Sequence, residues 1–506
     1  MEGGQDAETA TRNAINGMTA RLNNTAGAIT LSKDGDVGIH FSSSRMSWAY
    51  IKNDKLYYGI EQNQVLEEPL MKAIIAPCFP VHGSKINIIT DPRKFYETLC
   101  ERFRNANRNV SIASLYIGTG ALEKNLLEVT VANVKAKKDL KLKVLLDYQR
   151  GTRGEVNSRS VFRELTHDVS ERCDLALYQT PRLQGFWSKA LPARYNEIVG
   201  LQHMKLYIAD DCVLLSGANC SNDYFQQRQD RYVEIEDADL AKFYCELIDE
   251  VVKISKHDGK ESVKPSTKDV TISQMNKNIL TLIDKWKQRQ TRKLLTISDD
   301  TWVFPLIQMG EFNITQDEQA TCHILSSAPK ASYFRLATGY FNLTEQYSKT
   351  LLKDCKANIS LLMAHPNANG FMGAAGPAGG IPHAYSLIAR KFWQRVVDSN
   401  QASRVQMLEY ERAGWTFHAK GLWYYPPGSG VPWATLVGSA NLGERSVRRD
   451  LEAQAAIFTV SPDLQERLHE ECSKLHEYSS ECISELQERR TPLWVRATVG
   501  LFRTYF

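Results

Sequence analysis

Short apolar segments alternate with segments of helical periodicity through most of the chain. Asn109 to Tyr116 is the kind of largely apolar run that forms a buried strand, and a Gly118-Thr119-Gly120 turn follows it. From Ala121 to Val131 apolar positions recur at helical spacing, and Leu142 to Tyr148 is a further strand-like run. Strands in alternation with helices predict an α/β fold with helices on the faces of a mixed sheet.

The same order of elements occurs a second time. Ser332 to Thr338 is again strand-like, and Gly339 interrupts it in the place that Gly118 has in the first copy. Asn342 to Leu352 then has helical periodicity, with Asn342 or Thr344 as its cap, and Ile359 to Ala364 is a second apolar run. A tandem duplication explains this repetition. We therefore expect two tandem α/β lobes, each a mixed β-sheet flanked by helices.

Each copy continues to a His-x-Lys segment, His203-Met-Lys205 in the first and His418-Ala-Lys420 in the second. Residues two apart on a strand share a face, so each segment would present an imidazole beside an ammonium group. An apolar strand and a glycine-containing turn follow each segment, and the turns end in Asn219 and Asn441. A structural role alone does not readily explain why the same His-x-Lys segment, strand and turn occur twice. The repetition therefore favours a functional role for these residues.

Two facing His-x-Lys segments supply what exchange at a phosphodiester needs. One imidazole can attack phosphorus while the other, on the opposite side, relays a proton. The two lysines and the two asparagines can hold the non-bridging oxygens. This chemistry requires no metal, and no cluster of carboxylates predicts a metal site.

The composition narrows the class of protein. Charged residues make up 24% of the chain, and the net charge is only +4, which does not predict a protein that coats nucleic acid. None of the ten cysteines forms a C-x-x-C pair or a zinc-like cluster with histidines, which is typical of a reducing compartment. With no apolar run of about 18 residues, a spanning helix is not expected, and the chain should be soluble or peripheral to a membrane.

The segments outside the repeats complete the expected domain organisation. The 506 residues exceed the roughly 250–300 at which one core stops growing. We expect five parts: an N-terminal extension of unknown role at 1–65 without a readable targeting signal, a first lobe at 66–252, a helical, partly solvated connector at 253–298, a second lobe at 299–490 and an amphipathic segment at 491–506.

The last of these parts has two interpretations. As a helix, the segment would line one face with Val495, Val499, Phe502 and Phe506, and it would carry Arg496 and Arg503. The apolar face would either lie on a membrane surface, with the arginines at anionic headgroups, or pack on the core of the protein.

At the His-x-Lys segments the chain resembles the phospholipase D superfamily, whose signature is His-x-Lys-x4-Asp, six further residues and Gly-Ser-x-Asn. Asp210 completes this motif in the first copy. The resemblance implies a single active site at the interface of the two lobes. It also implies a covalent histidine intermediate.

Within the superfamily, the chain resembles the phosphatidylglycerophosphate synthases of the eukaryotic, mitochondrial type from about Cys78 to the C-terminus. The segments that carry this likeness are 78–82, 113–120, 200–210, 215–232, 302–309, 338–343, 414–423 and 445–454. The resemblance implies transfer of the phosphatidyl group of CDP-diacylglycerol to sn-glycerol 3-phosphate, with release of CMP. This is the first committed step toward phosphatidylglycerol and cardiolipin.

The resemblance also implies roles for the residues of the two motifs. His203 would be the nucleophile, and His418 would act as acid and then as base. The lysines Lys205 and Lys420 and the asparagines Asn219 and Asn441 would bind phosphoryl oxygens. Asp210 would belong to the catalytic residues. Asp210 and Glu452 would orient the side chains around the phosphate-binding residues.

The second motif departs from the superfamily pattern. Tyr425 stands where the motif would carry its aspartate, and residues 426–432 insert a Gly/Pro-rich loop. In the first motif, Gly217-Ala218-Asn219 reads as one residue shorter than Gly-Ser-x-Asn, which weakens the assignment of Asn219. The asymmetry suits unequal roles for the two histidines.

Substrate recognition is harder to predict than the chemistry. Arg150 and Arg153, just past a strand end, are candidates for the phosphate of the acceptor, although an exposed basic loop explains them nearly as well. The Gly118-Thr119-Gly120 turn is a candidate for binding nucleotide phosphates, and in similar enzymes this segment is treated as nucleotide-binding. His365 and His383 receive no role, because solvated or packed imidazoles are common.

Cofactors, partners and location follow from the resemblance. The chemistry needs no cofactor, although a nucleotide such as the CDP moiety or ATP could bind and a divalent cation could affect the activity. CDP-diacylglycerol, glycerol 3-phosphate and a membrane surface are the expected partners, nucleic acid is not, and a peripheral position on the mitochondrial inner membrane is implied. The alternatives are a phosphatidylserine synthase, a phospholipase D or a phosphodiesterase with the same histidines, and, in another class, an inactive lipid-binding scaffold.

Overall fold

The computed structural model describes residues 5–43, 46, 48–52, 55–59, 66–67, 76–183, 199–258, 268–294, 299–374 and 376–502. The chain forms two compact units, Met1–Ile75 and Ala76–Phe506. In the first unit, Asp6 caps helix α1 (Ala7–Leu22), which packs on the hairpin of β1 (Gly27–Leu31) and β2 (Val37–Phe41). A second small sheet consists of β3 (Trp48–Lys52), β4 (Lys55–Gly59) and β5 (Leu66–Glu67).

An eight-stranded sheet carries the first His-x-Lys copy, in the order β15-β10-β9-β8-β11-β12-β14-β7. Its strands are β7 (Ile86–Ile89), β8 (Asn109–Ala113), β9 (Lys141–Asp147), β10 (Cys173–Tyr178), β11 (Leu206–Ala209), β12 (Cys212–Ser216), β14 (Tyr232–Glu236) and β15 (Lys256–His257). The three strands β8, β9 and β10 are parallel, and the other pairs are antiparallel. Helices cover the parallel strands, which explains their continuous apolar runs.

A ten-stranded sheet carries the second copy, in the order β17-β16-β24-β23-β22-β18-β19-β20-β25, with β6 (Phe79–Val81) also paired to β16. The remaining strands are β16 (Thr301–Met309), β17 (Ile314–Thr315), β18 (Tyr333–Thr338), β19 (Asn358–Ala364), β20 (Val405–Tyr410), β22 (Gly421–Tyr425), β23 (Ala434–Gly438), β24 (Leu451–Thr459) and β25 (Ser479–Glu481). The path β10-β9-β8-β11-β12-β14-β7 recurs as β20-β19-β18-β22-β23-β24-β16. The topology thus confirms the predicted duplication and the α/β fold.

Strand register corrects the predicted alignment of the two copies. Ala113 pairs with Leu206, and Ala337 pairs with Gly421, each partner lying three residues after a motif histidine. Ala113 therefore corresponds to Ala337, and Gly339 corresponds to position 115 of the first copy. The expected equivalence of Gly339 with Gly118 is wrong by three residues.

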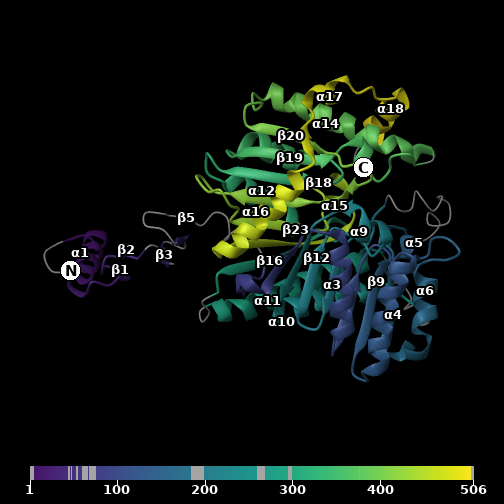
Figure 1. Cartoon of the computed structure of the whole chain (residues 1–506), viewed down its shortest axis with the longest axis horizontal. Coiled ribbons are helices and arrows are strands. Elements are labelled where there is room, and N and C mark those ends of the chain that lie inside the picture. The colour runs from purple at the N-terminus through teal and green to yellow at the C-terminus, as the bar shows by residue number, and fades with distance from the viewer. Residues whose placement is uncertain are drawn as a thin grey trace. The chain divides into compact units, whose positions relative to one another are not determined.

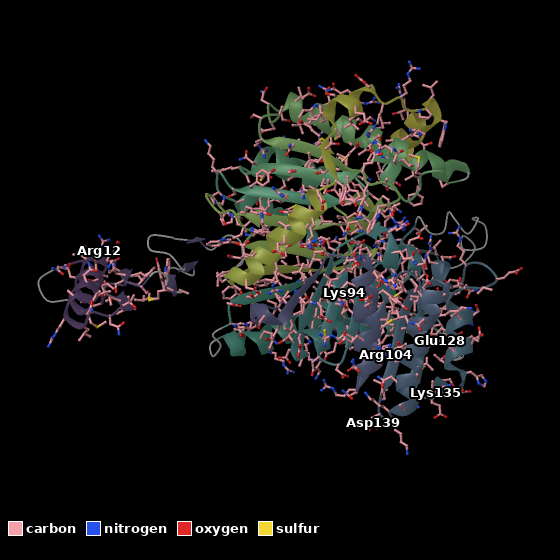
Figure 2. All side chains as sticks on the ribbon, in the orientation of Figure 1. Arg12, Lys94, Arg104, Glu128, Lys135 and Asp139 are labelled. Atoms are coloured by element: carbon pink, nitrogen blue, oxygen red, sulfur yellow. The ribbon has the colours of Figure 1, made fainter. Side chains whose placement is uncertain are left out.

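The helices cover the sheets and close the core between them (Figure 1). They are α3 (Pro92–Asn105), α4 (Ala121–Ala136), α5 (Tyr148–Gly151), α6 (Ser158–Thr166), α9 (Asn222–Gln226), α10 (Ala238–Lys253), α11 (Lys268–Leu294), α12 (Gln316–Ser327), α13 (Glu345–Lys349), α14 (Ile381–Asp398), α15 (Glu444–Arg448), α16 (Pro462–His476), α17 (Ile483–Glu488) and α18 (Leu493–Phe502). Charged side chains such as Lys94, Arg104, Glu128 and Lys135 lie on the outer faces of α3 and α4 (Figure 2). Thr344 caps α13 through the N–H of Tyr347, as predicted.

The two sheets share one hydrophobic core. It includes Leu206 and Leu215 from the first sheet together with Ala455 and Ile457 from the second. Helix α11, within the segment predicted as a connector, contributes the fully buried Trp286 to the same core. Residues 76–506 therefore form one packed body in which the two copies of the repeat face each other.

The C-terminal helix α18 packs on α14. Val495 and Val499 are buried, each with 1% of its surface exposed, whereas Leu493 and Trp494 are 79% and 50% exposed. The side chain of Phe502 and all of Phe506 lie outside the described residues. Over the part that is described, the predicted apolar face packs on the protein, which was the second of its two interpretations.

Candidate active site

The two His-x-Lys segments are each held by the opposite half of the duplicated unit. The backbone N–H of His203, just before β11, donates to the carbonyl of Leu451 at the start of β24, at 2.9 Å. The N–H of His418 donates to the carbonyl of Gln229 at 2.8 Å, where β13 (Arg228–Gln229) pairs with β21 (Thr416–Phe417). Each motif thus lies against the end of the other copy's sheet, and both reach the same interface.

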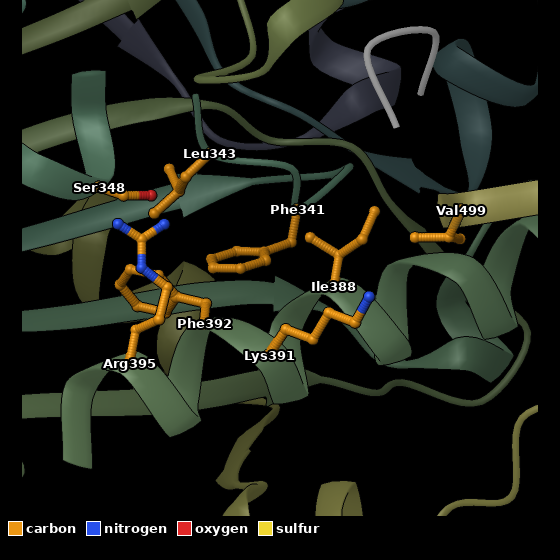
Figure 3. A pocket seen from close by; sticks show the side chains of 8 residues that line it. All are labelled: Phe341, Leu343, Ser348, Ile388, Lys391, Phe392, Arg395 and Val499. Carbon is orange, nitrogen blue, oxygen red and sulfur yellow. The ribbon is translucent and has the colours of Figure 1, made fainter. Parts of the chain in front are cut away.

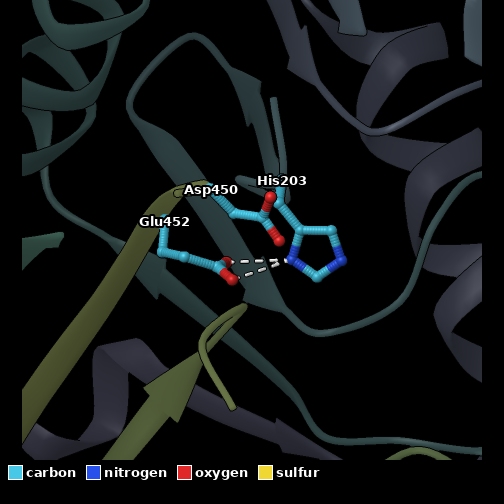
Figure 4. Close-up of side chains that lie close together, drawn as sticks. All are labelled: His203, Asp450 and Glu452. Carbon is cyan, nitrogen blue, oxygen red and sulfur yellow. Dashed lines mark hydrogen bonds and ion pairs between the residues drawn. The ribbon is translucent and has the colours of Figure 1, made fainter. Parts of the chain in front are cut away.

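Each histidine is also oriented by a carboxylate from the opposite copy. His203 Nδ1 lies 3.0 Å from both carboxylate oxygens of Glu452 (Figure 4), and His418 Nδ1 lies 2.6 Å from Asp230 Oδ2. Both carboxylate side chains are fully buried. A carboxylate on Nδ1 fixes the tautomer of the ring and directs Nε2 toward the reacting atoms.

Asp230 is a site residue that the motif analysis missed. Glu452 follows Asn441 by 11 residues, and Asp230 follows Asn219 by the same 11 residues. Applying the duplication to the orienting carboxylate would therefore have found Asp230 from the sequence. The crossing of each carboxylate to the other copy's histidine is a tertiary feature that this spacing does not contain.

The two lysines complete the pair of motifs. Lys205 Nζ donates to the carbonyl of His203 at 2.7 Å, and Lys420 Nζ donates to the carbonyl of His418 at 2.6 Å. Lys420 Nζ also lies 2.8 Å from His418 Nδ1 and 3.8 Å from Asp230 Oδ2. Both lysines are buried, so their ammonium groups are held at the centre of the site rather than in water.

Burial and positive charge keep both imidazoles neutral. Burial, reinforced by Lys205, lowers the pKa of His203 well below its ordinary value, and burial, reinforced by Lys420 and Arg228, does the same for His418. The charge of His203 itself contributes to the lowered pKa of His418, which is consistent with the two rings sharing one site. A neutral imidazole has the lone pair that a nucleophile or a base requires.

The two rings differ in accessibility. The side chain of His203 is 14% exposed, and its Nε2 points away from the neighbouring carboxylates (Figure 4). The side chain of His418 is 4% exposed, and its Nε2 lies 3.3 Å from the hydroxyl of Tyr224. Tyr224 and Tyr340 pack edge-on against this ring, with centroids 5.1 and 5.4 Å away. The site is therefore open at the first histidine and lined by tyrosines at the second.

The asparagine turns have the same length in both copies, which corrects the prediction of a shortened first motif. Ser216 pairs with Tyr232, and Gly438 pairs with Gln454, so Ser216 to Asn219 corresponds to Gly438 to Asn441. Glycine and serine have exchanged places within this turn. The buried Asn219 has an amide oxygen without a hydrogen-bond partner among the described residues, whereas Asn441 accepts from Thr338 at 3.4 Å.

Asp210 lies in a turn at the other end of β11, seven residues from His203. Its backbone has a φ of 52°, and its carboxylate accepts the N–H groups of Asn107, Arg108 and Asn109. None of its contacts among the described residues involves a motif histidine or lysine. We therefore assign Asp210 to the support of a loop and do not retain it among the catalytic or orienting residues.

The side chain of Glu123 packs against the Gly118-Thr119-Gly120 turn. A Cβ built on Gly118 would lie 2.1 Å from the buried carboxylate of Glu123, and one on Gly120 would lie 2.8 Å from it. That carboxylate accepts the N–H of Asn222 at 2.6 Å, so it serves a structural contact. The turn thus packs against a carboxylate of the protein itself, and nucleotide binding there stays a prediction.

The predicted acceptor arginines take different positions. The guanidinium of Arg150 lies over the ring of Tyr116, 4.8 Å from its centroid, and Arg153 is an exposed residue of the following loop. His383 is exposed as well, and His365 lies 3.3 Å from both Glu411 and Glu485. Of the two predicted arginines, Arg150 thus lies over an aromatic ring, and Arg153 lies on an exposed loop.

Two clusters contain atoms close enough to share a cation. His203, Asp450 and Glu452 form one, and His365, Glu409 and Glu485 form the other, each with its ligand atoms within 4.8 Å of one another. Arg445 pairs with Asp450 at 2.9 Å, and Arg489 pairs with both carboxylates of the second cluster. Each cluster therefore already contains a guanidinium that offsets its negative charge.

A small pocket lies beside α14 (Figure 3). Its lining consists of Phe341, Leu343, Ser348, Ile388, Lys391, Phe392, Arg395 and Val499. A second small pocket is lined in part by Gly339 and Tyr385, next to the site. Among the described helices none combines the length and the apolar content needed to cross a bilayer.

Comparison with known proteins found a family model and curated relatives that match this chain. Residues 1–60 match a family model described as asparaginase. The mitochondrial CDP-diacylglycerol–glycerol-3-phosphate 3-phosphatidyltransferase of Homo sapiens is 39% identical over 472 residues, which cover 85% of this chain and 85% of that protein. The CDP-diacylglycerol–glycerol-3-phosphate 3-phosphatidyltransferase of Saccharomyces cerevisiae is 31% identical and covers 79% of this chain and 84% of that protein.

Among solved structures, phosphatidylserine synthase of Haemophilus influenzae Rd KW20 superposes with a TM-score of 0.65 at 19% identity. The match covers 86% of this chain and 97% of that chain. At this level of identity the likeness shows the fold, in agreement with the two-sheet architecture, and not the substrate.

Proposed function

The chain belongs to the family of CDP-diacylglycerol–glycerol-3-phosphate 3-phosphatidyltransferases, and we propose on this premise that it transfers the phosphatidyl group of CDP-diacylglycerol to sn-glycerol 3-phosphate. The products are phosphatidylglycerophosphate and CMP. The observation that carries this proposal is the reciprocal pairing of His203 with Glu452 and of His418 with Asp230. Two neutral imidazoles with fixed tautomers in one buried site suit a double displacement at phosphorus.

In the first step, Nε2 of His203 attacks the phosphorus of the phosphatidyl group. The bond from phosphorus to the oxygen of CMP breaks, and a phosphatidyl-histidine remains. CMP leaves as a phosphate whose second pKa is near 6, so it needs little protonation. Lys205 and Lys420 lie where they can stabilise the charge on the phosphoryl oxygens, with Asn219 and Asn441 as additional ligands.

In the second step, His418 takes the proton of a glycerol hydroxyl, whose oxygen attacks the same phosphorus. The bond from phosphorus to His203 breaks, and His203 returns to its neutral form. Because an alcohol is far less acidic than CMP, this step depends more on base catalysis, which typically contributes about 10²–10⁴-fold in rate. The pairing of His418 with Asp230 stabilises the imidazolium that forms.

We also propose that the enzyme works peripherally on a mitochondrial membrane, where its lipid substrate is found. The relatives are named mitochondrial, and the exposed Leu493 and Trp494 at the start of α18 and the exposed Met372 provide apolar contacts for a membrane surface. We propose the inner membrane as this location. We also propose that the chemistry does not depend on a bound metal.

An acceptor screen tests the proposed function. Purified protein in mixed micelles with CDP-diacylglycerol is given glycerol 3-phosphate, serine or water, each with and without a chelator. We expect release of CMP that depends on glycerol 3-phosphate and persists with the chelator. Release that depends on serine instead, or full activity in His203→Ala, would contradict the proposal.

The histidine variants separate the two steps. A double displacement allows labelled CMP to exchange into CDP-diacylglycerol without any acceptor, because the first step is reversible. His203→Ala should lose both exchange and transfer. His418→Ala should keep slow exchange while its transfer falls by about 10²–10⁴-fold.

A further inference from the structure

A second buried cation lies beside His418, outside the two motifs. Arg228 forms β13 with Gln229, and its Nε donates to the hydroxyl of Thr416 at 2.9 Å, two residues before His418. Its guanidinium lies over the ring of Tyr224, 4.6 Å from the centroid, and its side chain is only 15% exposed. Since the hydroxyl of Tyr224 lies 3.3 Å from His418 Nε2, Arg228 belongs to the reacting side of the second histidine.

Arg150 approaches the same region from the first copy. It lies over Tyr116, whose hydroxyl is 3.2 Å from that of Ser221. Ser221 directly precedes α9, which carries Tyr224. Tyr340 packs on His418, and a Cβ built on Gly370 would lie 2.9 Å from Arg228 Nη2 and 3.7 Å from the hydroxyl of Tyr340. Burial raises the pKa of Tyr340, and the charges of Arg228 and Arg150 both oppose that rise, so both guanidinium groups act on one hydroxyl.

The balance of charge leaves Arg228 available for a ligand. The two lysines have the buried carboxylates Asp230 and Glu452 as counter-charges, and Arg445 has Asp450. In contrast, the one carboxylate paired with Arg228 among the described residues is Asp223, 3.6 Å away and 68% exposed. A guanidinium that is largely buried without a buried counter-charge is a strong site for an anion.

We propose that Arg228 and Arg150 bind the phosphate of the acceptor and that this clamp selects a phosphorylated alcohol. The inference rests on the proposed function. The phosphate monoester dianion would lie between the two guanidinium groups, beside the hydroxyl of Tyr340. The free hydroxyl of the acceptor would then replace the hydroxyl of Tyr224 at His418 Nε2. Arg153, exposed on its loop, is outside this clamp.

The test compares two acceptors that differ only in the phosphate. Transfer to glycerol 3-phosphate and to glycerol is measured for the native enzyme and for Arg228→Met, Arg228→Lys and Arg150→Met. We expect kcat/KM for glycerol 3-phosphate to fall on the order of 10–100-fold in the Met variants, while transfer to glycerol changes by less than about threefold. Arg228→Lys should be intermediate, because a lysine keeps the charge but loses the fork geometry.

Exchange of labelled CMP into CDP-diacylglycerol provides the reference, because it involves no acceptor. Exchange should fall less than transfer to glycerol 3-phosphate does in all three variants, and Arg93→Met, on the exposed surface of α3, should match the native enzyme in every assay. Unchanged selectivity for glycerol 3-phosphate in the Met variants would overturn the inference and leave the proposed function intact. Loss of exchange together with transfer in Arg228→Lys would also overturn it, because Arg228 would then act in the first step. A native enzyme that ignores glycerol 3-phosphate would instead refute the proposed function.

Discussion

At the scale of single residues, the site is built from two similar pairs with unequal surroundings. His203 and Glu452 form the open pair, and His418 and Asp230 form the pair that Tyr224 covers. Both copies carry the same His-x-Lys residues, so the difference arises from the neighbours and not from these residues. An open nucleophile and a covered base suit an enzyme that transfers to a selected alcohol rather than to water.

Asp230 should set the acid limit of the transfer reaction. Burial raises the pKa of Asp230 to about 6, whereas the pKa of His418 is well below its ordinary value. As the pH falls through about 6, Asp230 gains its proton before His418 does, and the carboxylate that stabilises the imidazolium is lost. We expect kcat/KM for glycerol, an acceptor without a titrating phosphate, to fall about tenfold per pH unit below that point.

Asp230→Asn removes the titrating group while keeping the shape of the side chain. Its transfer rate should be lower by about 10²-fold or more at neutral pH, because the amide cannot stabilise the imidazolium. The acid limb near pH 6 should disappear from its profile. A variant whose acid limb is the same as that of the native enzyme would show that another group sets it. Acceptor-independent CMP exchange reports whether the first step survives.

At the scale of elements, close backbone contacts position the second motif. A Cβ built on Gly339, after β18, would lie 2.9 Å from the Cα of His418. The corresponding position in the first copy is Leu115, so this contact belongs to the second copy alone. A strand that must pass so close to a catalytic residue tolerates only glycine there.

Gly339→Ala should therefore displace His418 without changing any functional group. We expect a loss of about 1–3 kcal/mol in the free energy of unfolding and about a tenfold or larger fall in transfer. Thermal unfolding and the transfer assay measure the two effects. Gly430→Ala is the matched control, since a Cβ there would meet nothing within 4 Å. Equal behaviour of the two variants would mean that the contact at Gly339 has no effect on His418.

Part of the fold and part of the site could be predicted from the sequence. The alternation of strands and helices and the repeated His-x-Lys segments predicted both sheets and four of the central residues, because burial and strand periodicity are local properties. Asp210 was placed in the wrong role, since a motif records spacing and not the direction of a turn with a φ of 52°. The crossing of Glu452 and Asp230 to the opposite copy depends on packing between segments more than 180 residues apart.

At the scale of the whole molecule, a buried ion pair connects the two halves behind the site. Arg231, next to Asp230, donates from Nε and Nη2 to the carboxylate of Glu471 on α16, both at 2.8 Å. The same guanidinium donates to the carbonyl of Leu436 and lies 3.8 Å from the centroid of Trp423, both in the second sheet. The position of Asp230 at His418 is thereby tied to the docking of the two sheets.

Removing one partner of this pair should destabilise the entire unit formed by residues 76–506. Arg231→Met leaves the buried carboxylate of Glu471 without its counter-charge, which typically costs about 3–5 kcal/mol in the free energy of unfolding. Arg231→Met combined with Glu471→Gln should recover part of that loss, since no uncompensated charge remains. Urea unfolding measures the stabilities, and CMP exchange reports whether the two halves still form one site.

Arg93→Met is again the control. The pair of Arg93 with Glu97 is exposed, so its loss should change the free energy of unfolding by less than about 1 kcal/mol. If Arg231→Met is no less stable than this control, the pair does not hold the sheets together. If the double variant is stable but inactive, Arg231 also positions Asp230, and this effect is separate from its contribution to stability. In the expected case, stability and activity recover together, because one interface both packs the halves and places each carboxylate on the opposite histidine.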